Sequence, residues 1–199
     1  FNGRVRYDGS NRQGKSKNAR WLPTWNVSGA WNLDRESFME FPWLTYLKLR
    51  ATYGLSANLF PEASALLNLQ SAVTLRPTDV ETYLYIQDLE NSELTWEKLH
   101  EFNVGVDFCI FNEYVTGCAD FYIRNSFDLV GVMQTSGIGG NAFKFGNYAD
   151  MTSEGFEVAI NTVNLAIDDF SWMTSFNVGY THDRITRLEF NPRLADAIA

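Results

Sequence analysis

The strongest constraint on the fold is a strict alternation of apolar and polar residues between Leu44 and Ser56. From Leu47 onward every second residue is apolar, while the positions between are Lys48, Arg50, Thr52, Gly54 and Ser56. Successive side chains of a β-strand point to opposite faces, so this stretch predicts a strand with one apolar and one hydrated face. The pattern recurs in most of the other strand-like stretches, with aromatic residues at their ends. It favours a sheet with lipid on one side and water on the other.

The composition excludes several classes of protein. No stretch approaches the roughly 18 consecutive apolar residues of a transmembrane helix, and the mean hydropathy is -0.22. The net charge of -8 argues against nucleic-acid binding, which needs clustered cations. The one basic run, over residues 12–20, is short and is interpreted as a solvated loop. The aromatic content of 15% suits strands and interfacial belts.

Alternation and turn residues together predict about seven strands. They are expected over residues 1–8, 20–32, 44–56, 95–110, 114–125, 147–164 and 170–183. Most are longer than the usual globular strand of about five or six residues, and match the roughly 9 to 11 residues that cross a bilayer at a tilt.

The links between these strands alternate in length. Long links are expected over residues 9–19, 57–94 and 126–146, and shorter ones over 33–43, 111–113 and 165–169. Membrane barrels have long loops on one side and short turns on the other, so the alternation predicts an up-and-down meander. Within the longest link we expect a short helix over residues 61–67 and a small strand over 81–87.

Aromatic residues are expected to form two belts. Trp21, Trp25 and Trp96 lie toward the long-link ends of the strands; Trp31, Trp43, Tyr46, Tyr114 and Trp172 lie toward the short-link ends. Such belts are typical of the two membrane interfaces. The alternative is that these rings pack the core of a soluble sandwich.

Neither the cysteines nor the histidines form a recognisable site. Cys109 and Cys118 flank the tight turn, and a disulfide is possible, but the favoured register pairs Cys118 with Asp107. His100 and His182 are isolated, no metal-ligand spacing is present, and no nucleophile or phosphate-loop motif occurs. We therefore predict no enzymatic activity, no cofactor and no metal.

Charged residues on the hydrated faces are the one candidate functional set. They are Lys48, Arg50, Glu97, Glu101, Asp107, Asp120 and Arg124. In a barrel they would line the lumen and could pair with one another, bind a plug or contact a polar solute. Pairing across neighbouring strands is the favoured role.

A series of short motifs follows the same order as in a known family. The motifs are Asp8-Gly9-Ser10, Arg20-Trp21, the strand from Trp25 to Trp31, Glu36-Ser37-Phe38-Met39, Leu47 to Gly54, Leu94 to Lys98, Phe102 to Phe108, Thr116-Gly117 with Asp120-Phe121-Tyr122, Glu154-Gly155-Phe156-Glu157, and Phe170-Ser171-Trp172 with Ser175-Phe176-Asn177. Taken in this order, they resemble the barrel motifs of SusC/RagA-type TonB-linked outer-membrane transporters. The sequence departs from that pattern at residues 55–60 and at the two cysteines.

The resemblance implies an all-β fold, an antiparallel up-and-down transmembrane barrel of about 22 strands. Residues 1–199 would form part of its C-terminal half, with the plug domain and the remaining strands outside this chain. It further implies TonB-driven import of a glycan or peptide across the bacterial outer membrane. The implied partners are outer-membrane lipid, TonB acting through the plug, and a SusD-type surface lipoprotein.

A soluble or surface-exposed β-sandwich or β-barrel binding module is the competing interpretation. In such a module the apolar faces would pack against each other instead of against lipid.

Overall fold

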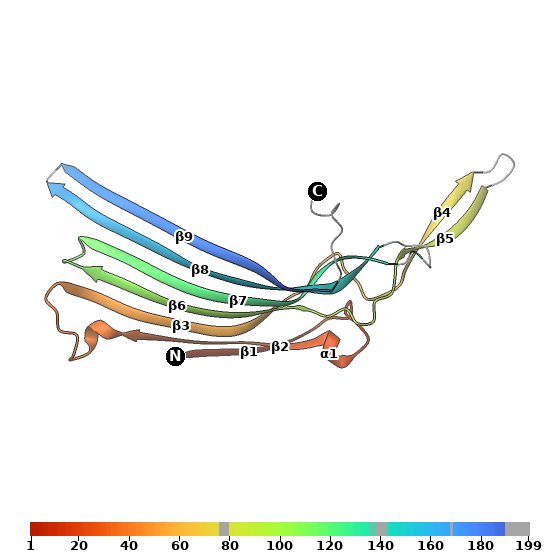
Figure 1. Cartoon of the computed structure of the whole chain (residues 1–199), viewed down its shortest axis with the longest axis horizontal. Coiled ribbons are helices and arrows are strands. Elements are labelled where there is room, and N and C mark those ends of the chain that lie inside the picture. Colours follow the sequence, from red (N-terminus) through yellow and green to blue (C-terminus); the bar gives the residue numbers. More distant parts are fainter. Residues whose placement is uncertain (76–79, 136, 138–142, 168, 190–199) are drawn as a thin grey trace.

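The computed structural model describes residues 1–75, 80–135, 137, 143–167 and 169–189. Its main element is a seven-stranded antiparallel sheet in which each strand pairs with the next one along the meander (Figure 1). The strands are β1 (Asn2–Gly9), β2 (Trp21–Asn32), β3 (Leu44–Asn58), β6 (Glu97–Ile110), β7 (Val115–Gln134), β8 (Phe143–Ile167) and β9 (Phe170–Leu188). Strands β4 (Asn68–Leu75) and β5 (Val80–Asp88) form a separate hairpin within the link from β3 to β6. The seven predicted strands are all confirmed, and so is the small strand in the longest link.

Strands β7 and β8 reach well beyond their predicted ends. Their pairing continues past a bulge at Asp128, from Leu129 opposite Ala149 to Gln134 opposite Phe143. Asp128 has a φ of 57°, and the bulge breaks the alternation of side chains there. The prediction of a long loop over residues 126–146 was therefore wrong, because most of that stretch is a tall hairpin.

The register places the predicted apolar residues on one face of the sheet. Ala51, Val104, Phe121, Phe156 and Tyr180 lie side by side across β3, β6, β7, β8 and β9. In the described residues no second layer covers this apolar face (Figure 1). Consequently Phe121, Phe156 and Tyr180 are 44%, 43% and 57% exposed. A large apolar surface of this kind is not stable against water and requires an apolar environment.

The apolar residues form a band that crosses the register obliquely. Toward the long loops the band ends on β9 at Tyr180, which is level in register with Phe156 on β8 and Phe121 on β7. On β7 the band continues two residues beyond Phe121, to Ile123, which is level in register with Tyr53 on β3. On β3 it continues two residues beyond Tyr53, to Leu55, which lies opposite His100. The edge thus moves by about one residue per strand. A level membrane requires such a shift when strands of a barrel tilt by about 35–45°.

The two ends of the sheet differ. At one end lie the tight turn between β6 and β7 and the 3₁₀ turn η1 (Leu33–Arg35) that follows β2. In the tight turn Phe111, Asn112 and Glu113 have φ values of 56°, 51° and 72°, so the predicted short link is confirmed. At the other end lie the longer loops and the short helix α1 (Lys17–Arg20), whose N-cap Ser16 accepts a hydrogen bond from the Ala19 amide. Neither helical segment of the described chain is long or apolar enough to cross a membrane.

The long loops pack together at that end. Ala63, Ala65 and Leu94 are buried and contact Phe60, Val130 and Phe145. We call this group and the backbone around it the loop assembly. The predicted helix over residues 61–67 was wrong. The Ala65 amide instead donates to the Arg12 carbonyl, and the Ala65 carbonyl accepts from the Asn91 amide, so the backbone groups are satisfied between loops.

The basic run over residues 12–20 belongs to the same assembly and is not a simple solvated loop. Gln13 and Ala19 are buried. A Cβ on Gly14 would lie 2.1 Å from the Ser92 carbonyl oxygen, so only glycine fits this close approach. Trp96 is only 8% exposed and its Nε1 donates to the Arg20 carbonyl. Its placement in an interfacial belt was therefore wrong, because the ring packs among the loops.

Candidate functional site

All seven predicted charged residues lie on the face opposite the apolar band, which we call the polar face. Lys48 is opposite Asp107 in register, Glu101 is opposite Arg124, and Gly105 lies between Arg50 and Asp120. Glu97 is opposite Asn58 on the same face. The structure therefore brings the set onto one surface of β3, β6 and β7, as the alternation predicted.

Arg50 is the hub of a charge cluster with two carboxylates. Its Nε lies 2.8 Å from Asp107 Oδ2, and its Nη2 lies 2.8 Å from Asp107 Oδ1 and 3.1 Å from Asp120 Oδ2. The cluster spans three strands, and its side chains are 21% to 34% exposed. Gly105 leaves the space for it, because a Cβ there would lie 2.3 Å from Asp120 Oδ1. A bidentate guanidinium–carboxylate pair fixes geometry as well as charge.

A second cluster lies nearer the long loops. Arg124 Nε is 3.3 Å from Glu101 Oε2, and the Arg124 guanidinium lies 4.3 Å from the centre of the Tyr122 ring. Glu97 accepts hydrogen bonds from the Asn58 side chain at 2.8 Å and from the Val130 amide at 2.9 Å. These carboxylates are thus occupied by neighbouring strands, as expected for a hydrated sheet face.

Lys48 is the exception within the predicted set. Although it is opposite Asp107 in register, Arg50 holds that carboxylate, and Lys48 makes no ion pair with any residue that the structure describes. Its ammonium group is therefore available to a segment or solute that enters the space above the polar face.

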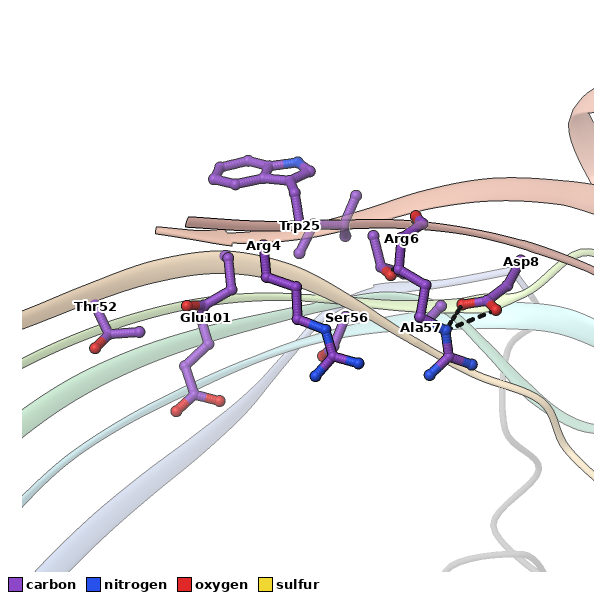
Figure 2. A pocket seen from close by; sticks show the side chains of 12 residues that line it. Arg4, Arg6, Asp8, Trp25, Thr52, Ser56, Ala57 and Glu101 are labelled. Carbon is purple, nitrogen blue, oxygen red and sulfur yellow. Dashed lines mark hydrogen bonds and ion pairs between the residues drawn. The ribbon is translucent and has the colours of Figure 1, made fainter. Parts of the chain in front are cut away.

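The sequence reasoning missed a groove on the polar face near β1. Arg4, Arg6 and Asp8 of β1 form one side, Thr52 and Gly54 of β3 contribute to the floor, and Glu101 lies beyond, around a hollow of about 430 Å³. Figure 2 shows the side chains of Arg4, Arg6 and Glu101 on the same side of the sheet, with Trp25 on the other. Two arginines at alternating positions of the first strand were the available signal, but the predicted set of charged residues begins at Lys48.

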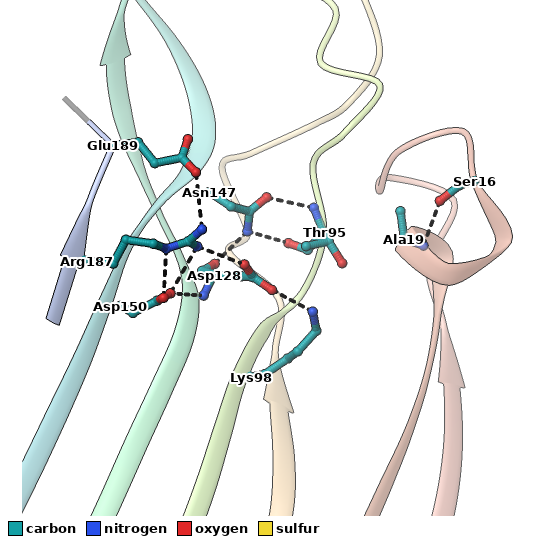
Figure 3. A network of polar contacts seen from close by, with 9 residues as sticks. All are labelled: Ser16, Ala19, Thr95, Lys98, Asp128, Asn147, Asp150, Arg187 and Glu189. Carbon is teal, nitrogen blue, oxygen red and sulfur yellow. Dashed lines mark hydrogen bonds and ion pairs between the residues drawn. The ribbon is translucent and has the colours of Figure 1, made fainter.

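It also missed a polar network at the long-loop end, which we call the rim network (Figure 3). Arg187 lies 2.8 Å from Asp150 and 3.4 Å from Asp128, and Lys98 lies 2.6 Å from Asp128. The network lies beyond Tyr180, where the apolar band ends. The Asp150 carboxylate accepts a hydrogen bond from Arg187, and this bond together with the negative charge of Asp150 raises the pKa of the Arg187 guanidinium above its ordinary value. The bulge at Asp128 makes this arrangement possible and has no simple sequence signature.

The described residues contain neither a metal-binding cluster nor a disulfide. Within the described ranges no three His, Cys, Asp or Glu side chains lie close enough to hold a metal ion. Cys109 and Cys118 are free thiols. Cys118 lies opposite Asp107 in register, and Cys109 opposite Thr116, which confirms the favoured pairing of the hairpin.

These features together define a class of protein. A single-layer antiparallel meander, with an oblique apolar band on one face and paired charges on the other, is an open arc of the wall of an up-and-down β-barrel. The chain belongs to the family described as TonB dependent receptor-like, beta-barrel, whose model matches residues 1–197.

Curated relatives and solved structures agree with this assignment. The chain is 30% identical over 199 residues to the TonB-dependent receptor SusC of Bacteroides thetaiotaomicron, covering 92% of this chain and 19% of SusC. It is 26% identical over 188 residues to the TonB-dependent receptor P3 of Formosa agariphila, covering 92% of this chain and 18% of that receptor. The RagAB peptide importer in its closed-closed state superposes with a TM-score of 0.83 at 25% identity, over 96% of this chain and 21% of that chain. The chain thus spans about a fifth of the length of the proteins it matches.

Proposed function

We propose that residues 1–199 form part of the barrel of a bacterial outer-membrane importer that takes up a glycan or peptide nutrient with energy delivered by TonB. The observation that carries the proposal is the oblique apolar band, because its shift of about one residue per strand is what a membrane requires of tilted strands. The family and the similarity to SusC and to a RagAB importer support it. In this proposal the plug domain and the remaining strands lie outside the chain.

The polar face is proposed to line the lumen. Its charges are largely neutralised by neighbouring strands, as Arg50 shows with Asp107 and Asp120. This supports a mainly structural role for Arg50, Asp107, Asp120, Glu101 and Arg124. Lys48, which has no ion pair in the described residues, is proposed to contact the plug.

The loop assembly is proposed to face the outside of the cell and to contact a SusD-type surface lipoprotein. Backbone hydrogen bonds tie the segments around Gly14, Ala65 and Leu94 to one another, and the Asn91 side chain donates to the Phe145 carbonyl of β8. A surface held in this way is ordered before a partner arrives, which lowers the entropic cost of association.

A soluble binding module fits the structure less well. A sandwich needs a second layer over the apolar face, and the described residues supply none. The apolar rings of Phe156 and Tyr180 stack on each other at 5.9 Å and face outward.

Two measurements on the bacterium that carries the gene test the proposal. The full-length protein should remain in the membrane fraction after carbonate extraction. A deletion strain should lose growth on one polymeric nutrient, glycan or peptide, while it still grows on the corresponding monomer. Recovery of the protein in the soluble fraction, or unimpaired growth on every polymer tested, would contradict the proposal.

A further inference from the structure

The groove beside β1 contains one arginine that makes no ion pair with any residue that the structure describes. We call it the arginine groove and define it by Arg4, Arg6, Asp8, Thr52, Gly54 and Glu101. Arg6 is paired with Asp8 at 2.7 Å, and Glu101 is paired with Arg124. Arg4 is exposed and makes no ion pair within the described ranges. After these pairs cancel, the guanidinium of Arg4 remains.

The geometry suits an elongated anion. Arg4 and Arg6 are separated by one residue on the same strand, so their Cα atoms lie about 7 Å apart and their side chains extend in parallel over the polar face (Figure 2). Between the two arginines and Glu101, the floor of the groove contains Gly54, where no side chain projects into the hollow. Gly54 has no side chain, and a Cβ at that position would lie 2.7 Å from the Trp25 carbonyl oxygen. The hollow of about 430 Å³ is large enough for one or two residues of an oligomer.

The groove also lies where a solute would arrive. Arg4 is opposite Asn26, which is opposite Gly54, and this row continues to Glu101 and Arg124. The Arg50 cluster lies four residues further along β3, toward the short turns. The groove is therefore on the long-loop side of that cluster, at the level where the apolar band ends on β3.

We propose that the arginine groove binds a carboxylate group of the imported oligomer, so that the importer selects acidic glycans or acidic peptides. This inference rests on the proposed function. The planar guanidinium of Arg4 would bind the carboxylate in a bidentate manner, and Arg6 would add charge while it remains tied to Asp8. Thr52 is placed to hydrogen-bond the polar part of the oligomer.

Modification of arginine by phenylglyoxal tests this in the full-length protein purified in detergent. Mass spectrometry reports the modification of Arg4, and that of Arg12, an exposed residue of the loop assembly, serves as internal reference. Four ligands are compared: tetragalacturonate, neutral maltotetraose, a tetrapeptide of glutamate and the matched tetrapeptide of glutamine. We expect an acidic ligand to slow the modification of Arg4 and leave Arg12 unchanged. The acidic ligand that protects identifies the source as glycan or peptide.

Variants provide a second readout. Arg4→Gln should weaken binding of the protecting ligand about tenfold, the loss of one charge-assisted pair, while Arg12→Gln should leave it unchanged. Three results would each overturn the proposal: protection by neither acidic ligand, equal protection by the neutral ligand, or an Arg4 that is unreactive before any ligand is added. The last result would mean that a protein segment fills the groove. None of them affects the growth test of import, so failure of the groove and failure of the transporter are distinguishable.

Discussion

The Tyr122 hydroxyl on β7 lies 2.6 Å from the Thr181 hydroxyl on β9, across the full width of β8. The residue between them in register is Gly155, and its lack of a side chain lets the tyrosine ring lie flat on the polar face. Tyr122 is consequently buried although the face itself is hydrated. The Tyr122 side chain thus connects β7 to β9 across β8. The glycine on β8 leaves the space that the ring occupies.

Replacing Gly155 with valine should destabilise the barrel. A Cβ at this position would lie 2.5 Å from the Tyr180 carbonyl oxygen and 2.6 Å from the Tyr122 hydroxyl. The carbonyl belongs to the paired strand and cannot move aside, so we expect a loss of about 1–3 kcal/mol. This loss of unfolding free energy is measured by guanidinium-induced unfolding of the full-length protein after it has been refolded into phospholipid vesicles.

Gly179→Ala is the matched control for this variant. It adds a Cβ to the same face, where the nearest atoms, in Glu157 and Phe156, lie 3.7 and 4.0 Å away. This variant should unfold like the unmodified protein. Equal stability of Gly155→Val and Gly179→Ala would show that the Tyr122 arrangement does not constrain β8.

The structural requirement for glycine at position 155 could not be predicted from the sequence. The motif that contains it, Glu154 to Glu157, was recognised as typical of the family, but the requirement for glycine comes from the side chain opposite it on β7. That relationship depends on the register, which alternation alone does not determine beyond the hairpin. Alternation did predict which face Phe156 and Glu157 occupy, because side-chain direction depends only on position along the strand.

Replacing Arg50 with lysine should weaken the charge cluster although the charge is kept. An ammonium group cannot make two parallel hydrogen bonds to Asp107 and also reach Asp120, as the guanidinium does. Because these side chains are 21% to 34% exposed, the expected loss of unfolding free energy is only about 1 kcal/mol.

Arg184→Lys is the control, since Arg184 is exposed on β9 and has no ion pair among the described residues. Its unfolding curve should not change. If Arg50→Lys and Arg184→Lys prove equally stable, the bidentate pair contributes nothing to the barrel.

Replacing Asn147 with alanine should loosen the loop assembly without affecting the sheet. The Asn147 side chain accepts a hydrogen bond from the Thr95 amide at 2.8 Å and donates to the Thr95 carbonyl at 2.9 Å and the Asp128 carbonyl at 2.6 Å. Its loss leaves partly buried backbone groups unpaired. We expect faster amide hydrogen exchange in peptides that cover residues 89–97, with unchanged exchange around Val104.

Asn161→Ala serves as the control, because in the part of the chain that the structure describes the Asn161 side chain makes one hydrogen bond, which it accepts from the Ser175 hydroxyl far from the loops. It should leave the exchange of residues 89–97 unchanged. Unaltered exchange there in Asn147→Ala would mean that other contacts hold the loops in place.

The loops were the part of the fold that the sequence could not predict. Their backbone hydrogen bonds run between segments far apart in the chain, as from Gly14 to Leu94, and local turn residues carry no signal for such pairing. The sequence located the charged residues and their face correctly. It gave no indication that Arg4 would make no ion pair with any described residue, because ion pairing depends on the distances between side chains of neighbouring strands.

Replacing Val104 with arginine should impair assembly of the barrel. Val104 lies within the apolar band, between Ala51 and Phe121 in register, and a cation near the middle of a bilayer costs about 2–4 kcal/mol. Asn103→Arg places the same side chain one residue away on the polar face and should be tolerated. Heat-modifiable migration of the full-length protein in membranes reports the folded fraction, and equal folded fractions for the two variants would argue against a lipid-facing band.

The most direct test of the two-faced barrel wall is a spin-label scan along β6 in the full-length protein. Single cysteines are introduced from residue 102 to 107 in a background where Cys109 and Cys118 are serine, and the labels' collision rates with oxygen and with a water-soluble nickel complex are measured in vesicles. Oxygen should dominate at residues 102, 104 and 106, and the nickel complex at 103, 105 and 107. Collision rates with no alternation, or a nickel complex that reaches 104 and 106 as readily as 103 and 105, would contradict the account.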